Sequence, residues 1–254
     1  MLWTMTEFIP RLVVLLLAII QIVTPSFVNP FRDGQAAFRA AAPSQIEPAG
    51  YAFSIWGPIY LLALAYAIWQ LAPAGRADPI TARIAPLAIA LYLGSSLWLA
   101  AAKYGPFWAT MPILAVMAVC ASIALVSAVA APAPSTWRIW LVIVPFGLYA
   151  GWTICATFVN IAEVAPGYGF NRFGLSIPAY GVASIAAATV LAAAILWLSN
   201  GELSFAATIV WALVAIIVAA RERQTSNEIV LSAGVGIILV VALTVVLKLK
   251  TDQS

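Results

Sequence analysis

The sequence predicts an all-α protein, a polytopic bundle of about eight membrane-spanning helices. Hydrophobic residues make up 64% of the 254-residue chain, whereas charged residues make up only 8%. A soluble domain carries roughly 25% charged residues, so most of this surface is expected to contact lipid. In lipid every backbone polar group must be paired within the protein, which leaves helices or closed barrels. Barrel strands alternate apolar and polar residues, whereas the apolar runs 12–20 and 235–247 are unbroken, so helices are expected.

A membrane-spanning helix needs about 20 mainly apolar residues. Between charged residues, prolines and glycines, the expected spans are 10–29, 49–71, 84–103, 109–130, 138–163, 178–198, 204–220 and 228–247. We interpret the first as a retained helix and not a cleaved signal, because Glu7 lies near Arg11 and the apolar run is long. The connections are short except for 30–48, so no separate soluble domain is expected.

The positive charge of the chain does not indicate a nucleic-acid partner. The net charge is +3 and the isoelectric point is near 9.0, but basic residues gather only at Arg221-Glu222-Arg223, and such loops are ordinary in membrane proteins. With eight spans, six Lys or Arg residues fall on each side, so the positive-inside rule does not fix the orientation. The expected partner is the lipid bilayer, and the expected location is multi-pass and integral to a bacterial inner membrane.

Residues for standard catalysis or metal binding are missing. The chain has no histidine, which removes the commonest general base, metal ligand and haem ligand. Cys120 and Cys155 fall in different spans, where they are expected to behave as small apolar groups. Glu163 is the carboxylate nearest a span interior, but Ala165-Pro166-Gly167 follow at once, so we expect it at the membrane interface. With no nucleotide-binding or hydrolase motif present, no catalytic residue, metal site or cofactor is assigned.

The start of the second span is the most distinctive part of the sequence. Pro48 precedes the helix, where its fixed φ suits a helix start. Phe53, Trp56 and Tyr60 follow at spacings of three and four, which places them on one helix face. Gly57-Pro58 inside the span predicts a kink. The aromatic face either contacts a ligand or a neighbouring helix, or it belongs to an interfacial aromatic belt.

The fifth span carries a second stripe. Tyr149, Trp152 and Asn160 recur at helical spacing, and Thr153 and Thr157 add a polar edge beside them. Polar side chains within spans usually form hydrogen bonds across helices. Two interpretations of this stripe remain open, a contact between helices and a pocket with a polar edge.

Taken in order, these segments resemble the tryptophan-rich sensory protein (translocator protein, TspO/MBR) family. The run from Pro48 to Tyr60 looks like its second-helix signature, and the pattern from Pro145 to Asn160 looks like its fifth-helix signature. Trp98 falls where that family has a tryptophan in the third helix. The resemblance covers residues 8 to 163 and implies that the first five spans are arranged like the TspO five-helix bundle. It therefore divides the chain into a TspO-like membrane domain, 1–163, and additional transmembrane helices of unassigned role, 164–254.

The resemblance implies a protein that binds a hydrophobic ligand, such as a tetrapyrrole (porphyrin), and transports or senses it. Arg32 and Arg39, in the long first loop, are candidates for pairing with ligand carboxylates, with solvated loop charges as the alternative. Because the chain has no histidine, stacking, apolar contact and arginine pairing would hold a tetrapyrrole, as a ligand and not as a cofactor. The residues expected to line the ligand site are Tyr51, Phe53, Trp56, Tyr60, Trp98, Tyr149, Trp152 and Asn160.

Two alternative functions remain open at this stage. Residues 164–254 are rich in Ala, Val and Ile, which suits packing against a second protomer in a homodimer or against a partner in a larger membrane complex. The chain would then be a structural or assembly subunit. Some members of the TspO family are proposed to degrade porphyrin in light, with pocket tryptophans as redox partners, so a light-dependent enzyme is the other alternative.

Overall fold

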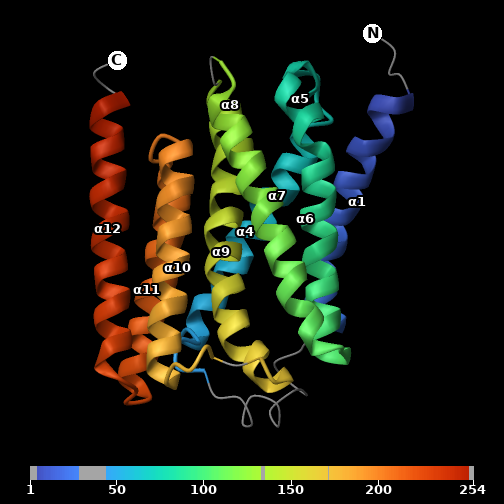
Figure 1. The fold of residues 1–254 in the computed structure, drawn as a ribbon. Coiled ribbons are helices and arrows are strands. Elements are labelled where there is room, and N and C mark those ends of the chain that lie inside the picture. Colours follow the sequence, from blue (N-terminus) through green and yellow to red (C-terminus); the bar gives the residue numbers. More distant parts are fainter. Residues whose placement is uncertain (1–4, 29–43, 133–134, 171, 252–254) are drawn as a thin grey trace.

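The computed structural model describes residues 5–28, 44–132, 135–170 and 172–251 as a bundle of long helices (Figure 1). Within these ranges every regular element is helical, and eight helices are long and apolar enough to cross a membrane. The predicted fold class is therefore confirmed. The long helices are α1 (Met5–Phe27), α4 (Trp56–Trp69), α6 (Pro79–Tyr104), α7 (Thr110–Ala130), α9 (Val144–Val164), α10 (Ile177–Leu198), α11 (Leu203–Glu222) and α12 (Asn227–Thr251).

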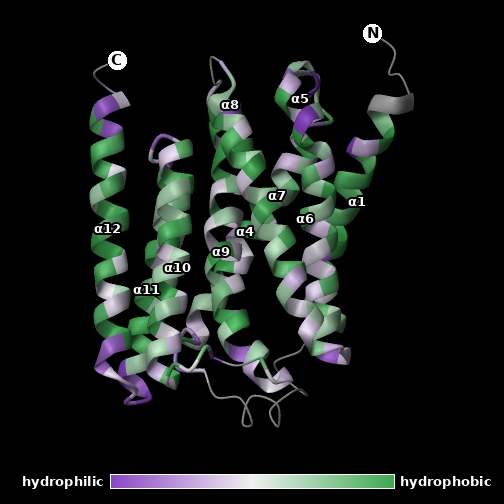
Figure 2. Cartoon of the chain, viewed as in Figure 1, coloured by the Kyte–Doolittle hydropathy of each residue, from purple (hydrophilic) through white to green (hydrophobic). Residues whose placement is uncertain are grey.

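Shorter helical segments extend or connect these spans. They are the 3-10 helices η1 (Gly50–Ile55), η2 (Phe107–Ala109) and η4 (Ala165–Tyr168), the short helices α5 (Pro73–Ala77) and α8 (Thr136–Arg138), and the π-helix η3 (Ile139–Ile143). The start of α1 and the end of α12 lie at the same end of the bundle (Figure 1). Apolar residues dominate the middle of the long helices, and hydrophilic residues gather at the helix ends (Figure 2).

The helix α9 is the centre of the bundle. It packs against α4 and α7 on one side and against α10 and α11 on the other. Helices α1, α4, α6, α7 and α9 form the first group, and α10, α11 and α12 pack together as the second. The two groups meet along α9, and the proposed division of the chain at residue 163 stays a prediction.

The third span begins earlier than predicted because its first turn is well capped. Asp78 accepts a hydrogen bond from the Ile80 backbone N–H at 3.1 Å, and Pro79 occupies the first helical position. Both features favour a helix start. Arg83, taken as the boundary in the sequence, lies inside α6 with an exposed side chain.

The prolines in the second and fifth spans change the type of helix. Pro58 lies in the first turn of α4, directly after η1, so the predicted kink takes the form of a change from 3-10 to α-helix. Pro145 cannot donate a hydrogen bond to the carbonyl four residues before it. The preceding turn is the wider π-helix η3, which accommodates the missing bond.

Two glycines bring α11 close to α9. A Cβ atom added at Gly147 would lie 2.6 Å from Glu202 Oε2, and one added at Gly151 would lie 2.8 Å from Thr208 Cβ. Glycines spaced by four residues let two helices approach closely in lipid, where apolar packing alone gives no preference for protein over acyl chains. The glycine face of α9 is therefore the contact that joins the two groups of helices.

A buried ion pair fixes the end of the bundle at which α5 and α8 lie. Arg138 donates to Asp78 through Nε to Oδ2 at 2.8 Å and through Nη2 to Oδ1 at 3.0 Å. The two side chains are only 8–9% exposed. Nearby, Arg11 donates to the Gln70 carbonyl and Gln70 Nε2 donates to the Arg11 carbonyl, which ties α1 to the end of α4. These contacts pair polar groups that lipid could not solvate.

Replacing Asp78 with alanine is expected to lower the free energy of unfolding by about 3–5 kcal/mol, because it leaves the Arg138 guanidinium buried without a carboxylate. Titration of the purified protein with sodium dodecyl sulfate in mixed micelles would measure the change. The double variant Asp78→Ala/Arg138→Met should recover much of the loss. A loss below about 1 kcal/mol, as for an exposed pair, would contradict this account.

Gly151→Ala is expected to destabilise the protein, since the new methyl group meets Thr208 Cβ and the Phe205 carbonyl oxygen at 2.8 and 2.9 Å. The control is Gly234→Ala within α12, where an added Cβ meets nothing within 4 Å. Alanine favours a helix over glycine by up to about 1 kcal/mol, so the control should be neutral or stabilising. Thermal unfolding in detergent would compare them, and the same midpoint for both variants would refute a close α9–α11 contact.

Candidate ligand site

The aromatic residues predicted from the sequence converge around Trp56. Its ring centroid lies 5.1 Å from that of Tyr60, 6.0 Å from Trp98, 5.8 Å from Tyr149 and 6.2 Å from Trp152. The rings come from α4, α6 and α9, so this cluster joins three helices of the first group. They lie inside the bundle and form an inward face, not an interfacial belt.

The spacing in the sequence explains why the rings of the second span share one face. Phe53 lies in the 3-10 helix η1, where residues three apart eclipse each other. Trp56 and Tyr60 lie in α4, where residues four apart are neighbours. The step of three and then four therefore follows the change of helix type. Phe53 reaches Trp152 with a centroid distance of 5.8 Å and nearly perpendicular ring planes.

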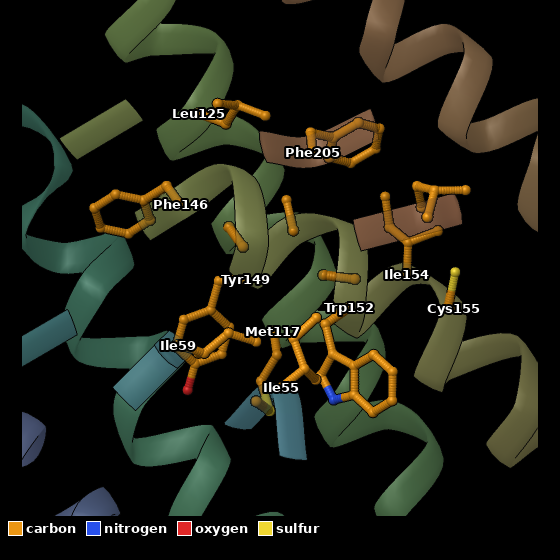
Figure 3. Close-up of a cluster of buried hydrophobic side chains, with 14 of the residues drawn as sticks. Ile55, Ile59, Met117, Leu125, Phe146, Tyr149, Trp152, Ile154, Cys155 and Phe205 are labelled. Atoms are coloured by element: carbon orange, nitrogen blue, oxygen red, sulfur yellow. The ribbon is translucent and has the colours of Figure 1, made fainter. Parts of the chain in front are cut away.

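Hydroxyl groups behind the cluster fix the tyrosine rings. The Tyr60 and Ser95 hydroxyl oxygens lie 2.9 Å apart, and the Tyr149 hydroxyl donates to Gln21 Oε1 at 2.8 Å. Tyr92, which the sequence analysis did not include among the site residues, stacks on Tyr149 at 6.0 Å. Figure 3 shows Tyr149 and Trp152 on the side of α9 that faces Ile55 and Ile59.

A cavity of about 70 Å³ opens beside this cluster, toward the end of the bundle opposite α5. Four predicted residues line it, namely Phe53, Trp98, Trp152 and Asn160. Trp56, Tyr60 and Tyr149 do not line the cavity and instead support its wall from behind. Of these seven predicted residues, four therefore line the cavity and three pack behind its wall.

Tyr51 lies apart from the cavity. Its side chain is 44% exposed and meets Trp211 of α11 edge-on, with a centroid distance of 5.3 Å. The 3-10 turn of η1 explains this placement, because Tyr51 and Phe53 point in different directions around its axis. Arg32 and Arg39 fall outside the described residues, so their pairing with ligand carboxylates stays a prediction.

Two tryptophans of the lining carry polar atoms without a partner. The Nε1 atoms of Trp98 and Trp152 are buried and have no hydrogen-bond acceptor among the described residues. A buried N–H group without an acceptor costs about 1–3 kcal/mol. Asn160 differs, because its Oδ1 accepts a hydrogen bond from the Thr110 hydroxyl at 2.9 Å, which joins α9 to α7.

The threonine edge of α9 does not supply polar groups to the cavity. Thr153 donates to the Tyr149 carbonyl at 2.7 Å, and Thr157 donates to the Thr153 carbonyl at 2.6 Å. Both hydroxyls are therefore used within their own helix. Asn160 and the Tyr149 hydroxyl instead form the bonds across helices that the sequence left open, to Thr110 of α7 and to Gln21 of α1.

Carboxylates also line the cavity. Glu163 is buried, with 8% of its surface exposed, and it lines the cavity together with Glu47. Because η4 continues α9 past it, the Glu163 side chain is covered by protein, and its expected depth at the membrane interface stays a prediction. Cys120 and Cys155 are buried free thiols, and the described residues include no cluster of His, Cys, Asp or Glu able to hold a metal ion.

The second group of helices supplies lining residues that the sequence analysis missed. Ala212 and Ile216 of α11 are buried and line the cavity beside Trp152 and Cys155. Alanine and isoleucine in a span give no signal of a site, and the one distinctive residue nearby is Trp211. The site is thus built from both groups of helices.

Comparison with known families now places the chain. A family model described as TSPO-like protein matches residues 8–246. The chain belongs to the TSPO-like protein family. The predicted resemblance is confirmed, and the matched range takes in α10, α11 and nearly all of α12 together with the first five spans. No curated protein and no solved structure matches the chain at a significant level.

Trp56→Ala is expected to destabilise this TSPO-like protein by about 3 kcal/mol or more, since it removes the ring that contacts four others and leaves a cavity. Trp137→Ala is the control, because that side chain is 63% exposed. An exposed substitution of this kind stays within about 0.5 kcal/mol. Unfolding in mixed micelles would compare the two, and equal losses would show that Trp56 does not organise the cluster.

Proposed function

We propose that this TSPO-like protein binds a flat, apolar ligand, with tetrapyrroles as the leading class, in the cavity between α6, α9 and α11. The observation that carries the proposal is the pair of buried indole N–H groups of Trp98 and Trp152, which have no acceptor among the described residues. Both side chains line the cavity, so a ligand that widens it would bring an acceptor atom to them. Without such a partner each N–H group costs stability, so their burial favours a binding role.

The rest of the lining suits an apolar ring system. Phe53, Trp98, Trp152 and Phe107 present aromatic surface to the cavity. Aromatic rings interact favourably in offset or edge-to-face arrangements and bury large apolar areas. The proposed ligand therefore combines a flat apolar body with at least one hydrogen-bond acceptor, and a metal-free porphyrin meets both requirements.

A ligand of that size requires the cavity to widen. The cavity measures about 70 Å³, whereas pockets for drug-sized molecules measure roughly 300–1,000 Å³. Glu47 and Pro48 line the cavity from a stretch, 46–49, that has no regular helix. We therefore expect this stretch to move away when a ligand binds. Its movement at the end of the bundle would couple ligand binding to transport or sensing.

Protoporphyrin IX should bind the purified full-length protein in detergent with a saturable change in the ligand's own absorbance and fluorescence, measured against protein-free micelles. Trp98→Phe and Trp152→Phe keep an aromatic ring but remove the N–H donor. Each is expected to raise Kd roughly fivefold, the effect of losing one hydrogen bond of about 1 kcal/mol.

The control for this titration is Trp140→Phe, since that side chain is 61% exposed and lies outside the cavity lining. It should leave Kd unchanged. An unsaturable response from the unsubstituted protein, or equal affinities for all three variants, would rule out binding at this cavity.

The same titration separates the two alternative functions. Loss of the porphyrin absorbance only under illumination would indicate the light-dependent enzyme, with Trp56, Trp98 and Trp152 as its neighbouring indoles. A protein without a saturable response that co-purifies with a partner at fixed stoichiometry would indicate the structural or assembly subunit.

A further inference from the structure

Helices α9 and α11 lie side by side with matched register. Gly147 faces Ser204, and Gly151 faces Thr208, so contacts advance by four residues along both helices. Residue numbers rise together, which means that the two helices run in the same direction. The next two turns bring Cys155 and Val159 of α9 level with Ala212 and Ile216 of α11, by the same step of four.

The cavity begins where the glycines end. Cys155, Val159, Ala212 and Ile216 all line it. Cys155 and Val159 replace the bare backbone with side chains, and the small side chain of Ala212 leaves the space between the helices unfilled. Since protein interiors are otherwise close-packed, the size of residue 212 decides how much of this space remains.

Helix α11 also holds residues 47–52, the closing segment, which borders the cavity through Glu47 and Pro48. The Ala49 backbone N–H donates to the Ala215 carbonyl at 3.0 Å, and Trp211 Nε1 donates to the Ala52 carbonyl at 3.1 Å. These bonds fix Ala49 and Ala52, on either side of the first turn of η1, directly before Phe53.

A charged contact holds the closing segment at Glu47, two residues before Ala49. Arg223 Nη1 lies 3.5 Å from Glu47 Oε2 and donates to the Glu47 carbonyl at 3.1 Å. Both side chains are partly exposed, so this contact can open without the cost of uncovering a buried charge.

We infer that α11 is a wall of the ligand site and the support of its closing segment, and that Ala212 is a specificity-determining residue that sets the depth of the cavity. The inference rests on the proposed binding function and extends it to the second group of helices. Those helices then determine the size of ligand accepted, in addition to any packing against lipid or a partner.

Chemical labelling of Cys155 tests, without any ligand, whether α11 forms a wall of the cavity. Cys155 lines the cavity, so N-ethylmaleimide that enters the cavity reaches its thiol, and Cys120→Ala removes the other cysteine. Ala212→Leu should slow the labelling roughly tenfold, because a leucine side chain fills most of the space. Ile216→Ala should speed it by enlarging the same space. Intact-protein mass spectrometry would follow the reaction.

Ala207→Leu is the matched control, since Ala207 lies on the exposed face of the same helix. It should label like the parent. Equal rates for Ala212→Leu and Ala207→Leu would overturn the assignment, and so would a Cys155 that stays unreactive in every variant, the enlarged Ile216→Ala included. Opposite effects of Ala212→Leu and Ile216→Ala exclude simple misfolding as the cause.

A second pair of variants tests whether α11 supports the closing segment. Arg223→Gln should speed Cys155 labelling roughly threefold, as expected for loss of a partly exposed ion pair. Arg221→Gln, an exposed arginine two residues earlier, should have no effect. The same rate for both variants would overturn this role for α11.

A protoporphyrin IX titration then distinguishes the inference from the function on which it rests. Ala212→Leu should lose the saturable response, and Ala207→Leu should keep it. Retained binding in Ala212→Leu would overturn the specificity role while leaving the proposed function in place. A parent protein that gives no response would refute the proposed function, and the labelling rates would still decide whether α11 forms the wall.

Discussion

The contact between α9 and α11 at Gly147 and Gly151 is the interaction on which the rest of this bundle depends. In lipid, two apolar helices gain nothing from mutual contact that acyl chains do not also provide, so association requires close approach or polar bonds. Two glycines on one face of α9 allow that approach without displacing the aromatic residues on its other face. The helix can therefore carry Tyr149 and Trp152 toward α4 and α6 and still accept α11 behind them.

Polar groups determine how the remaining helices meet. The Arg138–Asp78 pair, the reciprocal bonds between Arg11 and Gln70, and the tyrosine hydroxyls each join different helices. A bonded polar group in a nonpolar medium tolerates few alternative partners, because an unpaired one is costly. These contacts therefore fix the relative rotation of the helices, whereas the apolar side chains only fill the space that the rotation leaves.

The sequence predicts the fold and part of the site, and the physical reason differs between residues. Composition indicates lipid surroundings because so few residues are charged, and the charged residues, prolines and glycines that interrupt the apolar runs give the number of spans. Phe53, Trp56 and Tyr60 are predictable as one face because helical spacing is regular. Ala212 and Ile216 are not predictable as site residues, because alanine and isoleucine occur on every side of a membrane helix. Their place in the cavity lining depends on the packing of α11 against α9, which the sequence does not reveal. Tyr51 and Glu163 illustrate a third case, in which the local helix type at η1 and η4 decides where a side chain points.

The start of α1 and the end of α12 share one end of the bundle, which has a practical consequence. The aromatic cavity lies near the opposite end of the bundle, close to η1 and to the last turns of α6, α9 and α11. A reporter group attached beside Met5 or Thr251 would therefore sit at the opposite end of the bundle from the residues that close the cavity, and would not obstruct them.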